Sequence, residues 1–91
     1  MKKITFKKFS SNFCGPCKMI KPMWDEIKSE YSKLFNFVEI DCDTDDEQVE
    51  KFHIQGIPAI VVVDENDNEI SRVKIPVTQE GILDEIRKHM L

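Results

Sequence analysis

The chain has 91 residues, of which 41% are hydrophobic and 33% charged, a balance typical of one small globular domain rather than a disordered segment. Its net charge of −4 and its lack of a lysine and arginine cluster argue against DNA or RNA as a partner. Lys7 and Lys8 interrupt the apolar run that a signal peptide would need, and the longest apolar run, residues 59–63, is too short to span a membrane. We therefore expect a cytoplasmic protein without a membrane partner, in which residues 1–91 form a single domain.

The first half of the chain predicts a strand, a helix and a second strand. Residues 3–9 carry apolar groups on both alternating faces, as a covered strand would. Residues 14–34 carry apolar groups at spacings of three and four, which predicts a helix with one buried stripe: Cys17, Ile20, Trp24, Ile27, Tyr31 and Leu34. Residues 35–41 alternate as a second strand, and the long crossover between the strands predicts that they are parallel neighbours.

The second half begins with a short helix and the strongest strand pattern in the chain. Thr44 opens a capping-box pattern, which predicts the start of the short helix. The run Ala-Ile-Val-Val-Val at 59–63 predicts a buried strand, and Pro58 begins it at one of the few places where a sheet accepts proline.

A hairpin and a helix complete the chain. A polar turn at 64–68 joins the buried strand to a last strand at 69–75, which Pro76 ends. Thr78 is the expected N-cap of a final helix that buries four apolar residues: Ile82, Leu83, Ile86 and Met90. The order strand, helix, strand, helix, strand, strand, helix predicts one α/β domain.

The motif Cys14-Gly15-Pro16-Cys17 lies where the first helix is expected to begin. Cys14 would lie at or near the N-cap and Cys17 about one turn inside, so the two sulfurs would lie side by side. The unpaired N–H groups and the positive dipole end of a helix favour a thiolate, which lowers the pKa of a cysteine from about 8.5 to between roughly 3.5 and 7.5. Gly15 and Pro16 both suit a tight first turn. The motif therefore predicts a redox-active dithiol.

A zinc site is the structural alternative for this cysteine pair. Zinc needs four ligands, and only Cys42 and His53 could complete the set. Cys42 is expected at the far end of the second strand, or facing the core, and we interpret it as a small core or loop residue. We therefore predict no metal. No glycine-rich phosphate loop is present either, so we expect no bound nucleotide and no other cofactor.

Two stretches of the sequence resemble the thioredoxin family. Phe-Cys-Gly-Pro-Cys-Lys-Met-Ile-Lys-Pro at 13–22 is similar to the family's active-site stretch, with Phe13 in place of the usual Trp. Gly56-Ile57-Pro58 resembles the family's cis-proline loop. The resemblance covers nearly the whole chain and implies a thioredoxin-like fold, with a four-stranded mixed sheet of order 2-1-3-4 flanked by three helices. The family's usual N-terminal strand and helix are absent.

The resemblance also implies roles for individual residues. Cys14 would attack a protein disulfide and form a mixed disulfide, and the more buried Cys17 would then attack Cys14 and release the reduced target. Pro58, expected to be cis, would let the neighbouring chain face the thiols and pair with an extended substrate. The remaining substrate contacts would come from Phe13, Gly15, Pro16, Ile57 and the segment Ile75-Pro76-Val77.

Lys8 and Glu39 depart from the family's pattern. Lys8 aligns with a position where thioredoxins usually hold a buried Asp beneath the second cysteine, and Glu39 aligns where many carry a Lys. If the usual acid–base pair is present with its charges exchanged, Lys8 cannot accept a proton but would favour the thiolate of Cys17, which would make the protein more oxidising. Glu39 could be the partner of Lys8 or the proton acceptor. The alternative is that Lys8 extends to solvent and Glu39 lies on an exposed face.

Three functions remain open on the sequence alone. The first is a monomeric protein dithiol–disulfide oxidoreductase that transports electrons from a separate thioredoxin-reductase-like donor to disulfide-bearing protein substrates. The second is a thioredoxin-like interaction module without essential redox turnover. The third is a glutaredoxin-like, glutathione-dependent reductase, although no basic patch for glutathione is evident.

Overall fold

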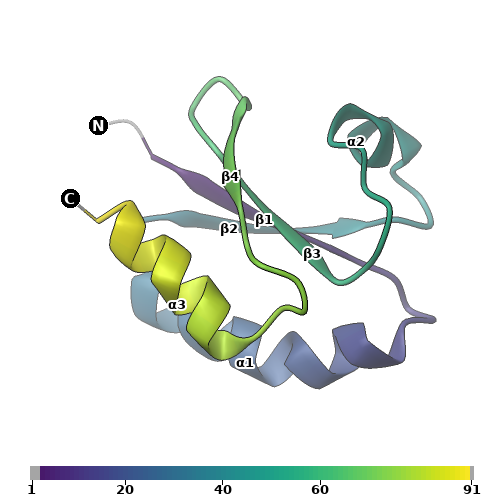
Figure 1. The fold of residues 1–91 in the computed structure, drawn as a ribbon, viewed down its shortest axis with the longest axis horizontal. Coiled ribbons are helices and arrows are strands. Elements are labelled where there is room, and N and C mark those ends of the chain that lie inside the picture. The colour runs from purple at the N-terminus through teal and green to yellow at the C-terminus, as the bar shows by residue number, and fades with distance from the viewer. Residues whose placement is uncertain (1–2, 91) are drawn as a thin grey trace.

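The computed structural model describes residues 3–90, which form one four-stranded sheet with helices on both faces (Figure 1). The elements, in chain order, are β1 (Thr5–Ser10), α1 (Gly15–Tyr31), β2 (Asn36–Asp41), α2 (Asp46–Lys51), β3 (Ala59–Val63), β4 (Glu69–Arg72) and α3 (Gln79–Lys88). The sheet order is β2-β1-β3-β4, in which β1 is parallel to β2 and antiparallel to β3, and β4 is antiparallel to β3. The predicted element order, strand order and mixed sheet are confirmed.

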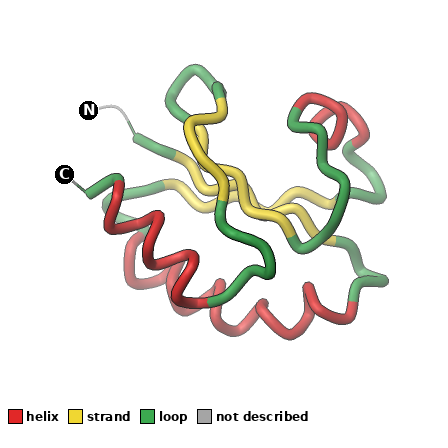
Figure 2. Tube along the Cα trace, viewed as in Figure 1, coloured by secondary structure: helices red, strands yellow, loops and turns green. Residues whose placement is uncertain are grey.

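The sheet separates two apolar cores, because α1 and α3 cover one face and α2 the other (Figures 1 and 2). Alternation along β1 sends Phe6 to the larger core beneath α1 and α3 and Phe9 to the smaller core beneath α2. The same alternation along β3 divides its five buried residues between the two cores. Both central strands are therefore covered on both sides, as their sequences predict.

The helix starts are fixed by side-chain caps. Thr78 caps α3 as predicted, since its hydroxyl accepts a hydrogen bond from the Gly81 N–H at 3.0 Å. The predicted cap of α2 is wrong by one residue, because Asp45 and not Thr44 accepts from the N–H of Gln48, at 3.2 Å. A carboxylate at this position satisfies the same unpaired N–H groups and also interacts favourably with the helix dipole.

Three predicted boundaries are also wrong. Strand β4 ends at Arg72 rather than at residue 75. Leu34 lies beyond the end of α1 and Met90 beyond the end of α3, and both side chains are exposed rather than buried. In each case an apolar residue continues a periodic pattern past the point where the chain leaves the regular element. Between residues 3 and 90, no helix combines the length and apolar character needed to cross a membrane.

Candidate active site

Helix α1 presents the cysteine pair at its N-terminal tip. Cys14 is the N-cap residue, with extended backbone angles, and its Sγ accepts a hydrogen bond from the N–H of Cys17 at 3.2 Å. Pro16 lies in the first turn, where the missing N–H leaves no helical hydrogen bond unmade. The predicted positions of both cysteines are confirmed, and the sulfur of Cys14 lies where the helix dipole favours negative charge.

The two cysteines form a disulfide, and their Cα atoms are 5.2 Å apart. Their surroundings differ. Cys14 is partly exposed, whereas Cys17 is only 3% exposed. The Sγ of Cys14 also lies 3.9 Å from the carbonyl oxygen of Ile57, so the loop before β3 contacts the outer sulfur directly. An incoming thiolate or disulfide can reach Cys14 but not Cys17.

An apolar groove of about 290 Å³ lies beside the disulfide. The Ile57–Pro58 and Ile75–Pro76 peptide bonds are both cis, so the cis form expected for Pro58 is confirmed. The groove brings together segments that are far apart in the sequence; it is lined by Pro16, Ile20, Gly56, Ile57, Pro58, Ile75, Pro76 and Val77. The surface is apolar and open, which suits an extended apolar chain.

Two of the expected contact residues, Phe13 and Gly15, do not line this groove. Phe13 is 90% exposed at the tip of α1, and Gly15 is exposed beside it. Two lining residues, Ile20 and Gly56, were not predicted as site residues, whereas Val77 was expected in the apolar rim and does line the groove. Helical spacing could have indicated Ile20, which follows Pro16 by four positions, and Gly56 directly precedes the predicted Ile57.

Lys8 is buried on the face of the sheet that α1 covers. Its side chain is 1% exposed, so the alternative in which Lys8 extends to solvent is wrong. Its Nζ lies 2.8 Å from the Oε1 of Glu39 and 5.3 Å from the ring centre of Trp24. The hydrogen bond from Lys8 and its positive charge lower the pKa of Glu39, although partial burial of the carboxylate opposes the shift. Of the two roles considered for Glu39, the structure shows the pairing with Lys8.

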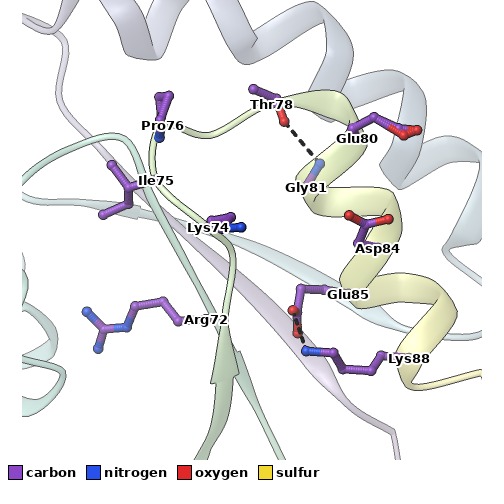
Figure 3. A pocket seen from close by; sticks show the side chains of 10 residues that line it. All are labelled: Arg72, Lys74, Ile75, Pro76, Thr78, Glu80, Gly81, Asp84, Glu85 and Lys88. Atoms are coloured by element: carbon purple, nitrogen blue, oxygen red, sulfur yellow. Dashed lines mark hydrogen bonds and ion pairs between the residues drawn. The ribbon is translucent and has the colours of Figure 1, made fainter.

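A larger pocket of about 670 Å³ lies away from the sulfurs, between the end of β4 and α3 (Figure 3). Its polar groups largely satisfy one another. Lys88 binds Glu85 at 2.9 Å, and the Thr78 hydroxyl caps Gly81, as Figure 3 shows. The guanidinium of Arg72 is held by Glu69 and by the carbonyl oxygen of Phe52. Lys74 and Glu80 also line this pocket, but it holds neither of the sulfurs.

Cys42 and His53 lie outside the dithiol site. Cys42 follows β2 and packs, partly buried, against the smaller core. Burial raises the pKa of its thiol, and the charges of Asp41, Asp43 and Asp45 raise it further. His53 is exposed after α2. Within residues 3–90, no group of three or more His, Cys, Asp or Glu side chains is arranged to hold a metal ion.

Comparison with known proteins agrees with this geometry. The family model described as Thioredoxin matches residues 1–88. Thioredoxin of Bacillus subtilis is 31% identical over 83 residues, a match that covers 90% of this chain and 78% of that protein. A Caenorhabditis elegans peptide-N(4)-(N-acetyl-beta-glucosaminyl)asparagine amidase is 30% identical over 81 residues, 89% of this chain, but the chain spans only 13% of that protein.

A solved structure shows the same fold. The crystal structure of thioredoxin NaTrxh from Nicotiana alata superposes with a TM-score of 0.86 at 28% sequence identity, covering 96% of this chain and 73% of that one. The family match, the sheet order and the disulfide at the tip of α1 are mutually consistent. The chain belongs to the thioredoxin family, and it is a thiol–disulfide oxidoreductase with Cys14 and Cys17 as its redox pair.

Proposed function

We propose that the reduced protein acts on protein disulfides, with Cys14 as the attacking thiol and Cys17 as the resolving thiol. The observation that carries this assignment is the contrast in exposure between two bonded sulfurs. Cys14 is partly exposed at the N-cap of α1, whereas Cys17 is buried one turn inside. The thiolate is the nucleophile in disulfide exchange, and the helix tip favours it at Cys14.

The reaction proceeds in two exchanges. The thiolate of Cys14 attacks one sulfur of the target disulfide, so a bond forms between Cys14 and that sulfur, and the other target sulfur leaves as a thiolate. The thiolate of Cys17 then attacks the Sγ of Cys14, forming the Cys14–Cys17 disulfide and releasing the second target sulfur. Water protonates the released thiolates. The target gains two electrons and the dithiol loses them.

The apolar groove is the proposed docking surface for the target. Pro58 has no N–H to donate, and the carbonyl oxygen of Ile57 lies beside the Sγ of Cys14, which supports pairing of an extended target segment along this loop. Ile75 and Pro76 also line the groove, as does Pro16 in the first turn of α1. Phe13 and Gly15 would contact the target outside the groove, where both are exposed.

The partners and setting are proposals of the same kind. A protein of this family needs a source of electrons after each turnover, and we propose a separate thioredoxin-reductase-like protein. We also propose that the chain works in the cytoplasm, as a monomer and as a single domain. The chain has three cysteines, and two of them form the redox pair. This leaves no set of structural disulfides of the kind found in secreted proteins, which supports a reducing compartment.

Reduction of insulin disulfides with dithiothreitol as the electron source tests the function. The wild-type protein should accelerate the reaction, and Cys14→Ser should reduce the rate to that of dithiothreitol alone. Cys42→Ser is the matched control, because it removes a thiol that lies outside the site, and it should keep the wild-type rate. If the wild-type protein gives no acceleration, the proposed function is wrong and the interaction-module alternative is favoured.

A further inference from the structure

The parallel register of β1 and β2 places a buried cation in the wall of a pocket that the inner cysteine also lines. Lys8 and Glu39 are direct cross-strand partners, so their side chains share the face that α1 covers. Cys17 and Trp24 are seven residues apart on α1 and are both buried against that face. Lys8 and Cys17 line the same pocket, of about 160 Å³. Lys8 and Cys17 therefore both contribute to the wall of one small, partly open pocket.

The charged groups around this pocket are mostly positive. Lys8 contributes from β1, Lys18 and Lys21 from α1, and Glu39 alone from β2. Lys21 is shared between Glu39, at 3.4 Å, and Asp25, at 3.0 Å, and all three of these groups are well exposed. The loop after β1 contributes only neutral side chains to the lining, and Asp43 reaches it indirectly through the hydroxyl of Ser11.

Burial determines which of these charges acts most strongly on the sulfur. Glu39 is 38% exposed, so water screens its charge, whereas the ammonium of Lys8 is almost completely removed from water. Coulombic interactions are stronger where the surroundings are less polarisable and are weakened by solvent. The unscreened influence on Cys17 is therefore positive, even though Lys8 and Glu39 are formally a neutral pair.

We infer that Lys8 is a positioning residue for the dithiol, whose buried ammonium stabilises the thiolate of Cys17 in the reduced protein and in the mixed disulfide. This inference rests on the proposed function, since it concerns the second exchange of that reaction. The lowered pKa of Glu39 means that its carboxylate is ionised at neutral pH and already accepts a hydrogen bond from Lys8. With its pKa lowered, Glu39 does not retain a proton at neutral pH, so the proton that Cys17 loses ends in water.

The direct test is a pH titration of Cys17 in the Cys14→Ser, Cys42→Ser variant, in which Cys17 is the only thiol. The absorbance of the thiolate reports the titration. Lys8→Met should lower the ratio of thiolate to thiol at a given pH at least tenfold, which moves the titration up by one pH unit. Lys8→Arg, which keeps the positive charge, should stay close to the parent. Lys7→Met is the matched control, because Lys7 is a buried lysine on the same strand but lies on the opposite face.

A second variant keeps the inference testable if Lys8→Met does not fold. Glu39→Gln removes the one carboxylate lining the pocket and should shift the titration in the opposite direction, with at least a twofold rise in the ratio of thiolate to thiol. A purely structural role for the pair predicts no such opposite shifts. Equal titration of the parent and Lys8→Met, or no rise in Glu39→Gln, would overturn the inference.

The intact dithiol gives a separate readout. The Cys14–Cys17 disulfide is equilibrated with dithiothreitol at a pH above the pKa of Cys17. The equilibrium constant should favour the disulfide about tenfold more in Lys8→Met than in the wild type. For a two-electron couple this is about 30 mV towards a more reducing protein. An unchanged equilibrium would contradict the inference while leaving insulin reduction intact. If the wild-type protein does not reduce insulin, the proposed function is wrong, whatever the titration shows.

Discussion

Two adjacent lysines on β1 are buried on opposite faces of the sheet. Lys7 is 9% exposed, and its Nζ contacts Asp67 at 2.6 Å, Gln48 at 2.7 Å and the ring of Phe52 at 5.0 Å. Lys8 is similarly placed, with one carboxylate and one aromatic ring as its neighbours. The residue type and burial are alike, but Lys8 lines a pocket together with Cys17.

The difference shows that the face of a strand, not the residue type, decides what a buried charge does. On the α2 face, Lys7 joins α2 to the turn between β3 and β4 through Gln48 and Asp67, which is a structural contact. On the α1 face, an equivalent lysine lines a pocket together with Cys17, whose sulfur is the proposed resolving nucleophile. The following experiments test this contrast, beginning with the largest expected effect.

Cys14→Ser should remove all disulfide reductase activity, because it eliminates the nucleophile at the tip of α1 while leaving the contacts of Lys7 unchanged. Insulin reduction measures the activity, and thermal unfolding under reducing conditions measures the stability. The expected result is a rate equal to the background with an unchanged Tm. Retained activity would mean that another sulfur performs the first attack.

The two lysines should differ in their effect on stability. Lys7→Met leaves Gln48 without its hydrogen bond and Asp67 with one ion pair fewer, so the free energy of unfolding should fall by about 1 kcal/mol. Lys8→Met leaves only Glu39 with one ion pair fewer, and this carboxylate is partly exposed and still contacts Lys21. The variant also removes the cost of burying an ammonium, so the free energy of unfolding should change by less than about 1 kcal/mol in either direction.

Urea unfolding followed by the fluorescence of Trp24, the single tryptophan, measures both variants in the reduced state. The contrast would be wrong if Lys8→Met were clearly the more destabilising of the two. That result would indicate that the main task of the Lys8–Glu39 pair is to hold β2 against β1, and not to act on the dithiol.

The carboxylate partners predict the response of stability to acid. The hydrogen bond from Lys8 lowers the pKa of Glu39; burial raises that of Asp67, but its ion pairs with Lys51 and Lys7 outweigh burial and lower it overall. Because both values are lowered in the folded state, the stability they contribute is complete above the ordinary values of 4.5 and 3.8 and is lost as the pH falls through the lowered ones.

Glu39→Gln and Asp67→Asn should therefore each reduce the loss of stability between about pH 5 and pH 2. Unfolding free energies at several pH values compare the variants with the wild type. A variant whose stability falls with acid as steeply as that of the wild type would show that the corresponding ion pair contributes nothing measurable in solution.

Cys42→Ser should have the smallest effect. The raised pKa of the Cys42 thiol keeps it protonated at neutral pH, and its partial burial limits access. Alkylation of the reduced wild-type protein at pH 7, followed by mass spectrometry of its peptides, should label Cys14 before Cys42. Faster labelling of Cys42 would indicate a reactive thiol on the α2 face, for which the account has no role.

The sequence predicts the parts of the site that depend on local patterns. The spacing of Cys14 and Cys17 at a helix start predicts their different exposure, and alternation along the central strands predicts two covered faces. The exchange of charges at Lys8 and Glu39 could be proposed from the family pattern, but only the strand register makes them neighbours. Lys21 was missed, although it follows Cys17 by four positions on α1.

Features that depend on the path of irregular segments could not be predicted in the same way. Strand β4 ends three residues early, and the chain from Val73 to Val77 then turns towards the dithiol and completes the groove. No periodic pattern records such a change of direction. Nor does the sequence reveal that Asp45 rather than Thr44 caps α2, because both residue types suit an N-cap and only the local backbone distinguishes them.

Trapping of the mixed disulfide tests the central claim most directly. Cys17→Ser removes the resolving sulfur but keeps the partly exposed one, so reaction with a disulfide-bearing protein should give a stable adduct through Cys14, detectable by non-reducing electrophoresis and mass spectrometry. The matched variant Cys14→Ser should give none. An adduct formed by Cys14→Ser, or none by Cys17→Ser, would contradict the assignment of Cys14 as the attacking thiol and Cys17 as the resolving one.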